Sequence, residues 1–403
     1  TVPRGSVGQD YLKLVARHYN AEDTFRRTPC GVFFGEEGKT VPDPYFDGEG
    51  PPRTGCTFCG ECMQGCRVGA KNTLMKNYLW FAEKNGAVIH PERQVVHIEP
   101  LGAKDGSDGY RVITRRPGAW LYTQQREFRA RGIVFSAGAL GTNQLLAKSK
   151  LEGTLPDVSD RLGDLVRTNS ESVLAVTLPK GSGDTWNDVF ISSSIHPRPD
   201  THIEFTTFGR NADSMSLIYT MLTPNGTRLT RPLKWLGSFF RHPITFLKAA
   251  WPFGWSARTV IYLVMQPLDN AISFRARRGL FGRFKFSTEQ DKEKPNPTFI
   301  PIANEAAEVL AKETGGVPQS MVLEALGDIP TTAHILGGAV VGKDPDHGVV
   351  DTRQRVFGYK NMMICDGSTM PANPGVNPSQ TITAMSEHAM SQVPVSKPQW
   401  WDE

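Results

Sequence analysis

The side chains best suited to chemistry lie in two pieces of the C-terminal part of the chain. In the first piece, His334 stands shortly before the pair Gly337-Gly338, which can bring an imidazole and bare backbone close to a ligand. In the second, Asn377-Pro378 precedes a predicted final helix, whose free first-turn N–H groups can face a partly negative ring together with the Asn377 amide. An imidazole has an ordinary pKa of about 6.5, so it transfers protons well at neutral pH. A single histidine is more often structural than catalytic, and this interpretation therefore depends on the other motifs.

A second candidate site is a run of cysteines. The pattern Cys56-x2-Cys59-x2-Cys62-x3-Cys66 has the spacing of bacterial ferredoxin ligands, whose thiolates hold an iron–sulfur cluster, although Arg67 stands where those proteins have proline. Zinc sites usually pair two separated Cys-x2-Cys knuckles, and reduced, buried cysteines in a turn-rich segment are a third interpretation. We predict a [4Fe-4S] or [3Fe-4S] cluster at these four cysteines, with zinc or no metal as the alternatives.

The elements that position these residues are those of an α/β fold. The apolar run 132–135 leads through the turn Ala137-Gly138 into a helix predicted over 143–150. A buried strand that delivers a glycine turn to a helix presents backbone N–H groups to a phosphate or cofactor. Residues 165–300 alternate apolar with polar side chains, which predicts an antiparallel sheet. Further helices are predicted near 10–19, 73–84, 304–314 and 379–393, and a strand at 361–364.

Taken together, the motifs resemble the glucose–methanol–choline flavoproteins, and the cholesterol oxidase branch is closest in pattern. The resemblance extends from roughly residue 40 to residue 395. The segments that carry it are Ala70-Lys71-Asn72-Thr73-Leu74, Asn77-Tyr78-Leu79, Ser136-Ala137-Gly138-Ala139-Leu140-Gly141-Thr142, Gly348-Val349-Val350-Asp351, Arg355–Asn361, Asp366-Gly367-Ser368-Thr369-Met370-Pro371 and Gly375–Ile382.

This resemblance implies roles for individual residues. His334 would orient the alcohol and assist removal of its proton, and Asn377 would face the flavin or the substrate oxygen. Glu204 matches a glutamate that projects over the flavin as a base, although the residue alone is equally an outward-facing strand carboxylate. The residues implied to line FAD are Val96, whose backbone would bind the adenine, and Asn72, Ala137, Gly138, Asp366, Gly367 and Pro378.

The domain organisation follows from the same resemblance. An FAD-binding, Rossmann-like domain would comprise residues 1–165 and 345–403, including the cysteine segment 56–66, and an antiparallel-sheet substrate-binding domain would comprise residues 166–344. The family carries a Gly-x-Gly-x-x-Gly fingerprint near its N-terminus, and this chain has none after a strand. We therefore predict that the Rossmann-like domain is incomplete at its N-terminus. A further N-terminal segment or another chain would complete the FAD site.

The implied reaction is the FAD-dependent oxidation of a small apolar alcohol, sterol-like by the branch, to a ketone or aldehyde. A cluster beside the flavin would pass single electrons to a carrier protein, whereas without one O2 would be the acceptor. The competing interpretation is a non-catalytic electron-transfer or assembly subunit that keeps the cysteines. The presence of His334, Asn377 and Glu204 together argues against such a subunit.

Charge and hydropathy narrow the choice of partners. A net charge of +4 is too small and too evenly spread for a nucleic-acid binder. No run approaches the ~18 apolar residues that a membrane span needs. The aromatic, basic segment Leu229–Trp255 either contacts a membrane surface peripherally or forms a core helix pair with snorkelling cations, and its Pro and Gly residues exclude one long helix. Crowded cysteines without a disulfide framework predict a cytoplasmic location, with peripheral membrane contact as a further expectation.

Overall fold

The alternation of apolar and polar residues in the middle of the chain produces a seven-stranded antiparallel sheet. The structure is a computed structural model that describes residues 1–394. The sheet belongs to unit 1, which comprises Thr1–Ile89, Ser170–Gln266 and Pro297–Thr331. Its elements are α1 (Val7–His18), η1 (Glu22–Thr24), β1 (Arg26–Arg27), β2 (Thr40–Val41), β3 (Arg53–Thr54), η2 (Leu74–Lys76), α2 (Tyr78–Lys84), β8 (Ser172–Thr177), β9 (Ile191–Arg198), β10 (Thr201–Thr206), η3 (Asp213–Ile218), β11 (Tyr219–Met221), α4 (Thr230–Arg241), α5 (Pro243–Ala250), η4 (Ser256–Arg258), β12 (Thr259–Met265), α6 (Pro301–Thr314), β15 (Val317–Met321) and α7 (Val322–Gly327).

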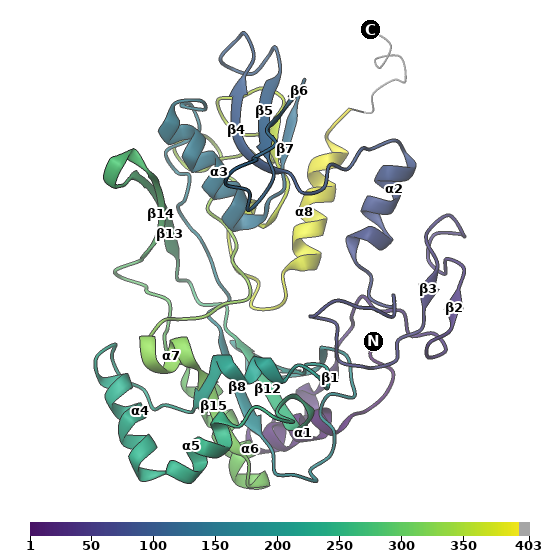
Figure 1. Cartoon of the computed structure of the whole chain (residues 1–403), viewed down its shortest axis with the longest axis vertical. Coiled ribbons are helices and arrows are strands. Elements are labelled where there is room, and N and C mark those ends of the chain that lie inside the picture. The colour runs from purple at the N-terminus through teal and green to yellow at the C-terminus, as the bar shows by residue number, and fades with distance from the viewer. Residues whose placement is uncertain (395–403) are drawn as a thin grey trace. The chain divides into compact units, whose positions relative to one another are not determined.

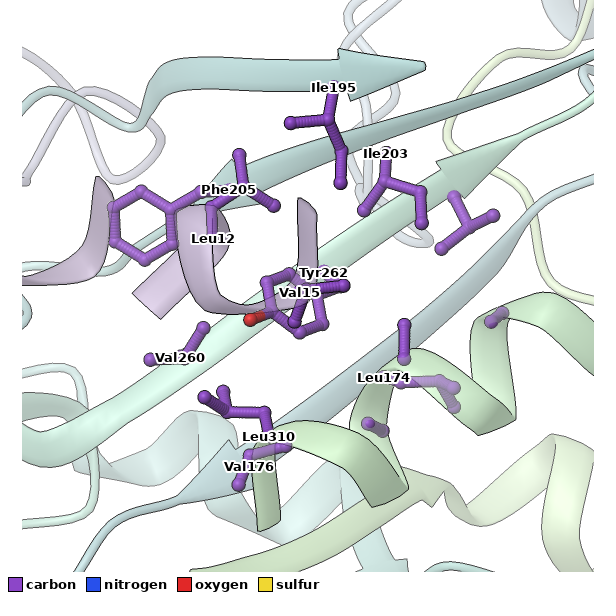
Figure 2. Close-up of a cluster of buried hydrophobic side chains, with 14 of the residues drawn as sticks. Leu12, Val15, Leu174, Val176, Ile195, Ile203, Phe205, Val260, Tyr262 and Leu310 are labelled. Carbon is purple, nitrogen blue, oxygen red and sulfur yellow. The ribbon is translucent and has the colours of Figure 1, made fainter. Parts of the chain in front are cut away.

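The strands of this sheet follow the order β1-β9-β10-β12-β8-β15-β11. Helices α1 and α6 pack over one face of it, where a buried apolar cluster joins strands and helices (Figures 1 and 2). From β10 this face receives Ile203 and Phe205, and from α1 it receives Leu12 and Val15, all fully buried. Each such side chain stabilises the fold by about 1.5–3 kcal/mol. Because neighbouring strand residues point to opposite faces, the packing of Phe205 directs Glu204 to the other face.

The remaining described residues form unit 2, which comprises His90–Asn169, Pro267–Asn296 and residues 332–394. It contains three small sheets and two long helices. The α/β prediction with an antiparallel sheet is confirmed by the two units together. The elements of unit 2 are β4 (Gln94–Pro100), β5 (Tyr110–Arg115), β6 (Arg126–Ala130), β7 (Ile133–Phe135), α3 (Gly138–Glu152), β13 (Ile272–Arg278), η5 (Leu280–Gly282), β14 (Phe284–Gln290), β16 (Met362–Ile364), η6 (Gly367–Thr369) and α8 (Ser379–Ser391). A second apolar cluster joins β4, β5, β7, β16 and α3 there.

Several predicted elements differ from the observed ones at their ends. The helix expected over 73–84 is interrupted at Asn77, whose φ of −145° and ψ of −102° are not helical. Helix α3 begins at Gly138, five residues before its predicted start at 143, because the glycine turn itself opens the helix. The segment Leu229–Trp255 forms the two short helices α4 and α5, with Pro243 in the first turn of the second. Among the described helices, none combines the length and the apolar character that crossing a bilayer requires.

Candidate active site

Two parallel strands bring predicted cofactor residues to one edge of unit 2. Strands β7 and β16 pair in parallel, with Ile364 opposite Phe135. Because parallel strands end at the same edge, the turns that follow them, Ala137-Gly138 and Asp366-Gly367, lie together. A hydrogen bond from Gly138 N to Asp366 Oδ2 at 3.0 Å joins the two turns. This is the location at which open α/β sheets bind their ligands.

Asp366 holds these turns in place. Its Oδ2 also accepts from Thr142 Oγ1 at 2.5 Å, and its Oδ1 accepts from Ser368 N at 2.8 Å and Ser368 Oγ at 2.5 Å. With the bond from Gly138, four donors therefore occupy the carboxylate. We infer that Asp366 acts on a ligand through the backbone that it positions. Thr142 and Ser368 were not predicted as site residues.

The loop that carries His334 packs against the turn after β16. Gly337 N donates to Gly367 O at 2.8 Å, and Ala339 N donates to Ser368 O at 2.9 Å. The His334 side chain is half-buried in this loop. The structure thus joins the loop of the candidate catalytic histidine to the turn of two candidate cofactor residues.

The glycine pair after His334 is required by close packing. Gly337 and Gly338 have φ values of +78° and +87°, which L side chains rarely adopt. A Cβ on Gly337 would stand 2.2 Å from Leu165 O, and one on Gly338 would stand 2.5 Å from Asn143 Nδ2. The buried Asn143 amide also donates to Gly337 O at 3.0 Å. Asn143 is a supporting residue that sequence reasoning missed, because its partners lie far along the chain.

The loop before the last helix carries Asn377 and Pro378. Asn169 fixes it, since Asn169 Oδ1 accepts from Gly375 N at 3.2 Å and Asn169 Nδ2 donates to Val376 O at 2.9 Å. Helix α8 then begins without a hydrogen bond from a capping side chain. Its first-turn N–H groups can therefore serve a ligand, as expected from the Asn-Pro pattern. No motif around Asn169 signalled its supporting role.

Val96, the predicted adenine contact, lies at an irregularity of strand β4. The register shifts between Val95, opposite Thr114, and His97, opposite Ile113. A residue at such a bulge is released from the regular ladder, which suits a backbone contact to a ligand. The Val96 carbonyl accepts from Lys148 Nζ at 2.7 Å, so part of its backbone is already bonded within the protein.

Two other predicted residues, Glu204 and Asn72, lie in unit 1. Glu204 is 2% exposed on β10, which excludes the outward-facing strand carboxylate. His202 Nε2 lies 3.8 Å from Glu204 Oε1, and the His202 ring stacks on that of His196 at 4.5 Å between centroids. Burial, together with the nearby charge of Arg26, lowers the pKa of His196. Glu204 is therefore the buried carboxylate end of a row of titratable side chains whose other end, His196, is exposed.

Asn72 is held by a buried arginine. Its Oδ1 accepts from Arg53 Nη2 at 2.8 Å, and its backbone N donates to Gly31 O at 2.7 Å. The same Arg53 nitrogen donates to Lys76 O at 2.6 Å. Asn72 is thus positioned by its own unit, and its contact with a flavin stays a prediction.

The four cysteines line one small pocket of unit 1 together with Lys71. All of them are free thiols, and the room between them, about 10 Å³, suits one water molecule. Burial raises the pKa of Cys56 to about 11 and also raises that of Cys62. Although burial opposes it, backbone N–H groups, first that of Lys71, lower the pKa of Cys66. Within residues 1–394 no group of three or more His, Cys, Asp or Glu side chains is arranged to hold a metal ion. The four thiols share one pocket but form no metal-ligand arrangement there, so an iron–sulfur cluster at Cys56, Cys59, Cys62 and Cys66 stays a prediction.

The predicted residues therefore fall into two sets. His334, Asn377, Val96, Ala137, Gly138, Asp366, Gly367 and Pro378 belong to unit 2, whereas Glu204, Asn72 and the four cysteines belong to unit 1. The functional division into residues 1–165 with 345–403 and residues 166–344 stays a prediction.

The turn after β7 fits a dinucleotide cofactor. Gly138 has a φ of +73°, and no heavy atom lies within 4 Å of the position that a Cβ would take. Helix α3 begins there without a hydrogen bond from a capping side chain, so open backbone and first-turn N–H groups meet at one point. Parallel strands, glycine turns and helix N-termini arranged in this way are typical of α/β proteins that bind dinucleotides.

Comparisons with known proteins identify the family. The GMC oxidoreductase models match residues 52–165 and 292–386. Cholesterol oxidase of Acinetobacter baumannii is 45% identical over 389 residues, which cover 95% of this chain and 70% of the relative. Cholesterol oxidase of Mycobacterium tuberculosis (strain H37Rv) is 46% identical over 395 residues, which cover 95% of this chain and 67% of the relative. The chain belongs to the GMC oxidoreductase family, and it is a flavin-dependent enzyme that acts on alcohols with FAD as cofactor.

One solved structure supports the fold alone. Pyridoxine 4-oxidase from Mesorbium loti superposes with a TM-score of 0.54 at 14% identity, covering 97% of this chain and 70% of that one. Its fold therefore agrees with the predicted flavoprotein fold.

Proposed function

We propose that this enzyme oxidises an apolar, sterol-like secondary alcohol to a ketone. The observation that carries the proposal is the hydrogen bonding of the His334 loop to the Gly367 turn, in a chain similar to two cholesterol oxidases. FAD, when bound, would supply the acceptor for the hydride of the carbinol carbon. The residues of the chain then bind the alcohol, orient it and move its hydroxyl proton.

His334 and Asn377 would act on the hydroxyl group. The imidazole of His334 is half-buried, and it would accept a hydrogen bond from the hydroxyl and assist removal of its proton. The Asn377 amide would donate to the substrate oxygen and fix its orientation. The anchoring of both loops by buried glycine and asparagine contacts supports these roles.

Glu204 would be the base that finally takes the hydroxyl proton, which His334 helps to remove as the hydride leaves the carbinol carbon. Its proposed role rests on the motif match and on its burial beside His202. A buried carboxylate accepts protons more readily than an exposed one.

A further segment or another chain would complete the FAD site. The pair β7–β16 is only two-stranded, and parallel sheets in α/β folds are larger and covered on both faces. A groove of about 1060 Å³ beside it includes the half-exposed Val134 of β7 and Met363 of β16. These features support an additional strand and helix docking there, which would bring the missing glycine fingerprint.

O2 is the proposed electron acceptor, because both relatives are named oxidases. An iron–sulfur cluster that feeds an electron-carrier protein stays a prediction, and no step proposed above passes through it. A cytoplasmic location likewise stays a prediction.

The test of the proposed function is turnover of cholesterol and of a short-chain alcohol by the complete, FAD-loaded protein. His334→Ala should lower kcat by roughly 10²–10⁴-fold, the typical contribution of general acid–base catalysis, while flavin content stays unchanged. His347→Ala is the matched control, since His347 is exposed and pairs with Asp344. Unchanged turnover in the His334 variant would overturn the assignment.

The acceptor and the cluster are tested by oxygen uptake and by visible absorption of anaerobically purified protein before and after a reductant. Flavin bands alone, with one O2 consumed per alcohol, would support the oxidase. A broad iron–sulfide absorption that bleaches together with the flavin bands would support the prediction of a cluster that passes electrons to a carrier protein.

A further inference from the structure

Helices α4 and α5 form a hairpin whose inner face is already packed. Trp235, Phe239 and Phe246 contact one another there, with centroid separations of 5.7 Å between Trp235 and Phe246 and 4.7 Å between Phe239 and Phe246. Trp235 Nε1 donates to Thr220 Oγ1 of β11 at 2.8 Å. The fully buried Arg231 ties the start of α4 to Asp328 at 3.2 Å. These contacts fix the hairpin to unit 1 without help from its other face.

That other face is apolar and exposed. On α4 its residues recur at helical spacing, and on α5 the pattern continues. Phe240 is 72% exposed, Ile244 69% and Leu247 66%. We name the set the outer face of the hairpin: Leu229, Leu233, Leu236, Phe240, Ile244, Leu247, Trp251 and Phe253. Single exposed apolar residues are ordinary, but a contiguous row of this kind marks an interaction surface.

Positive charge accompanies the outer face. No Asp or Glu occurs between Asp213 and Asp269, and Lys234, Arg241 and Lys248 are exposed along the hairpin. Exposed apolar side chains whose only charged neighbours are cationic are typical of helices that lie in the interface of an anionic membrane. A protein partner or a second copy of the chain would have to bury these cations against its own acids.

A groove at the base of α5 has the same mixed character. It holds about 480 Å³ within unit 1 and is lined by both apolar and cationic side chains. Arg258 donates to Leu178 O at 2.8 Å in its wall, and burial lowers the pKa of Arg258. Among residues 1–394, those that line the groove include no acidic side chain. Its lining includes Ile244, Leu247, Trp251, Lys180, Lys248 and Arg258.

We propose that the outer face of the hairpin docks on an anionic phospholipid bilayer, with a lipid headgroup in the groove at the base of α5. The apolar side chains would enter the headgroup–acyl boundary while the cations meet phosphate groups. This contact is peripheral, because α4 and α5 are 12 and 8 residues long. It goes beyond the oxidation of an alcohol and does not depend on it.

Vesicle co-sedimentation of the complete enzyme, without substrate, tests the proposal. Vesicles of phosphatidylcholine alone are compared with vesicles that also contain phosphatidylglycerol. Wild-type protein should bind the anionic vesicles at least ~tenfold more tightly, and high salt should weaken this binding. Phe240→Ser with Ile244→Ser should lower binding by at least ~tenfold, whereas Val88→Ser, a similarly exposed apolar residue elsewhere in unit 1, should not.

The electrostatic part needs its own variants. Lys248→Glu should lower binding to anionic vesicles by more than ~tenfold and hardly change binding to neutral ones. Lys312→Glu, the same charge change on the exposed side of α6, should leave both unchanged. An unchanged melting temperature shows that each variant is folded. Membrane docking would be overturned if wild-type protein stayed in the supernatant with anionic vesicles. It would also be overturned if light scattering showed a dimer of the wild type and a monomer of the variant with Phe240→Ser and Ile244→Ser. Neither result would affect the proposed oxidation.

Discussion

The contact between Gly8 of α1 and Phe205 of β10 offers a sharp test of how unit 1 is packed. A Cβ added to Gly8 would stand 1.9 Å from Phe205 Cζ and 2.4 and 2.5 Å from the two Cε atoms. Carbon atoms in contact lie about 3.5–4.0 Å apart, so one element must move by roughly 1.5–2 Å. Overpacking of this kind costs about 1–3 kcal/mol, and the better helix propensity of alanine returns about 1 kcal/mol at most. Gly8→Ala should therefore lower the free energy of unfolding by up to about 2 kcal/mol.

The sign of this effect should reverse in a second background. Leucine lacks the Cζ and Cε atoms, so in a Phe205→Leu protein the clash disappears and Gly8→Ala should stabilise by about 0.5–1 kcal/mol. Urea unfolding of wild type, both single variants and the double variant gives the coupling between the two positions, which should equal the overpacking cost of about 1–3 kcal/mol. Gly237 of α4 is the control, because nothing lies within 4 Å of its Cβ position and Gly237→Ala should stabilise the protein. An equal effect of Gly8→Ala in both backgrounds would refute the packing argument.

Three further predictions concern other parts of the chain. Burial raises the pKa of Glu324 to about 7, above its unfolded value, so its stabilising contribution is full at low pH and is lost as pH rises through 7. Relative to wild type, Glu324→Gln should gain about 1–3 kcal/mol in unfolding free energy between pH 5 and pH 8.5, measured in urea, whereas exposed Glu308→Gln should show no such change. Asp366→Asn replaces one carboxylate oxygen, which accepts from two donors, by an amide donor, so flavin retention on gel filtration should fall at least ~tenfold, unlike in exposed Asp346→Asn. Gly337→Ala should destabilise by at least about 1–3 kcal/mol in thermal unfolding, and an unchanged melting temperature would contradict the φ argument.

Local patterns predicted much of the candidate site. The strand–turn–helix at Ala137-Gly138 and the helix after Asn377-Pro378 are short motifs, and the structure contains both. The residues that hold these motifs were missed. Asn169 and Val376 lie 207 positions apart, and Asn143 and Gly337 lie 194 apart, so no local pattern links them. Such partners emerge only when the fold closes loops of this length.

The hairpin shows a related limit. Its sequence places large apolar residues on both helical faces, Trp235 and Phe239 on one and Phe240 and Ile244 on the other. Helical spacing separates two faces but does not say which one packs against the protein. Thr220 of β11 decides this, because its hydroxyl accepts the Trp235 indole N–H.

Glu204 illustrates what packing adds to a motif match. Along a strand the side-chain period is two, so the sequence allows Glu204 to face either solvent or the interior. Phe205 and Ile203 pack in the apolar cluster under α1 and α6. Because side chains alternate along β10, Glu204 and His202 point to the opposite face of the sheet, where both are buried. A carboxylate costs free energy when it is buried, and a protein retains one there only with compensating partners or a function. Because Phe205 sets this orientation, Gly8→Ala should lower kcat as well as the free energy of unfolding if Glu204 is the base. A Gly8→Ala protein that is less stable but has an unchanged kcat would show that the packing of β10 does not affect the reaction.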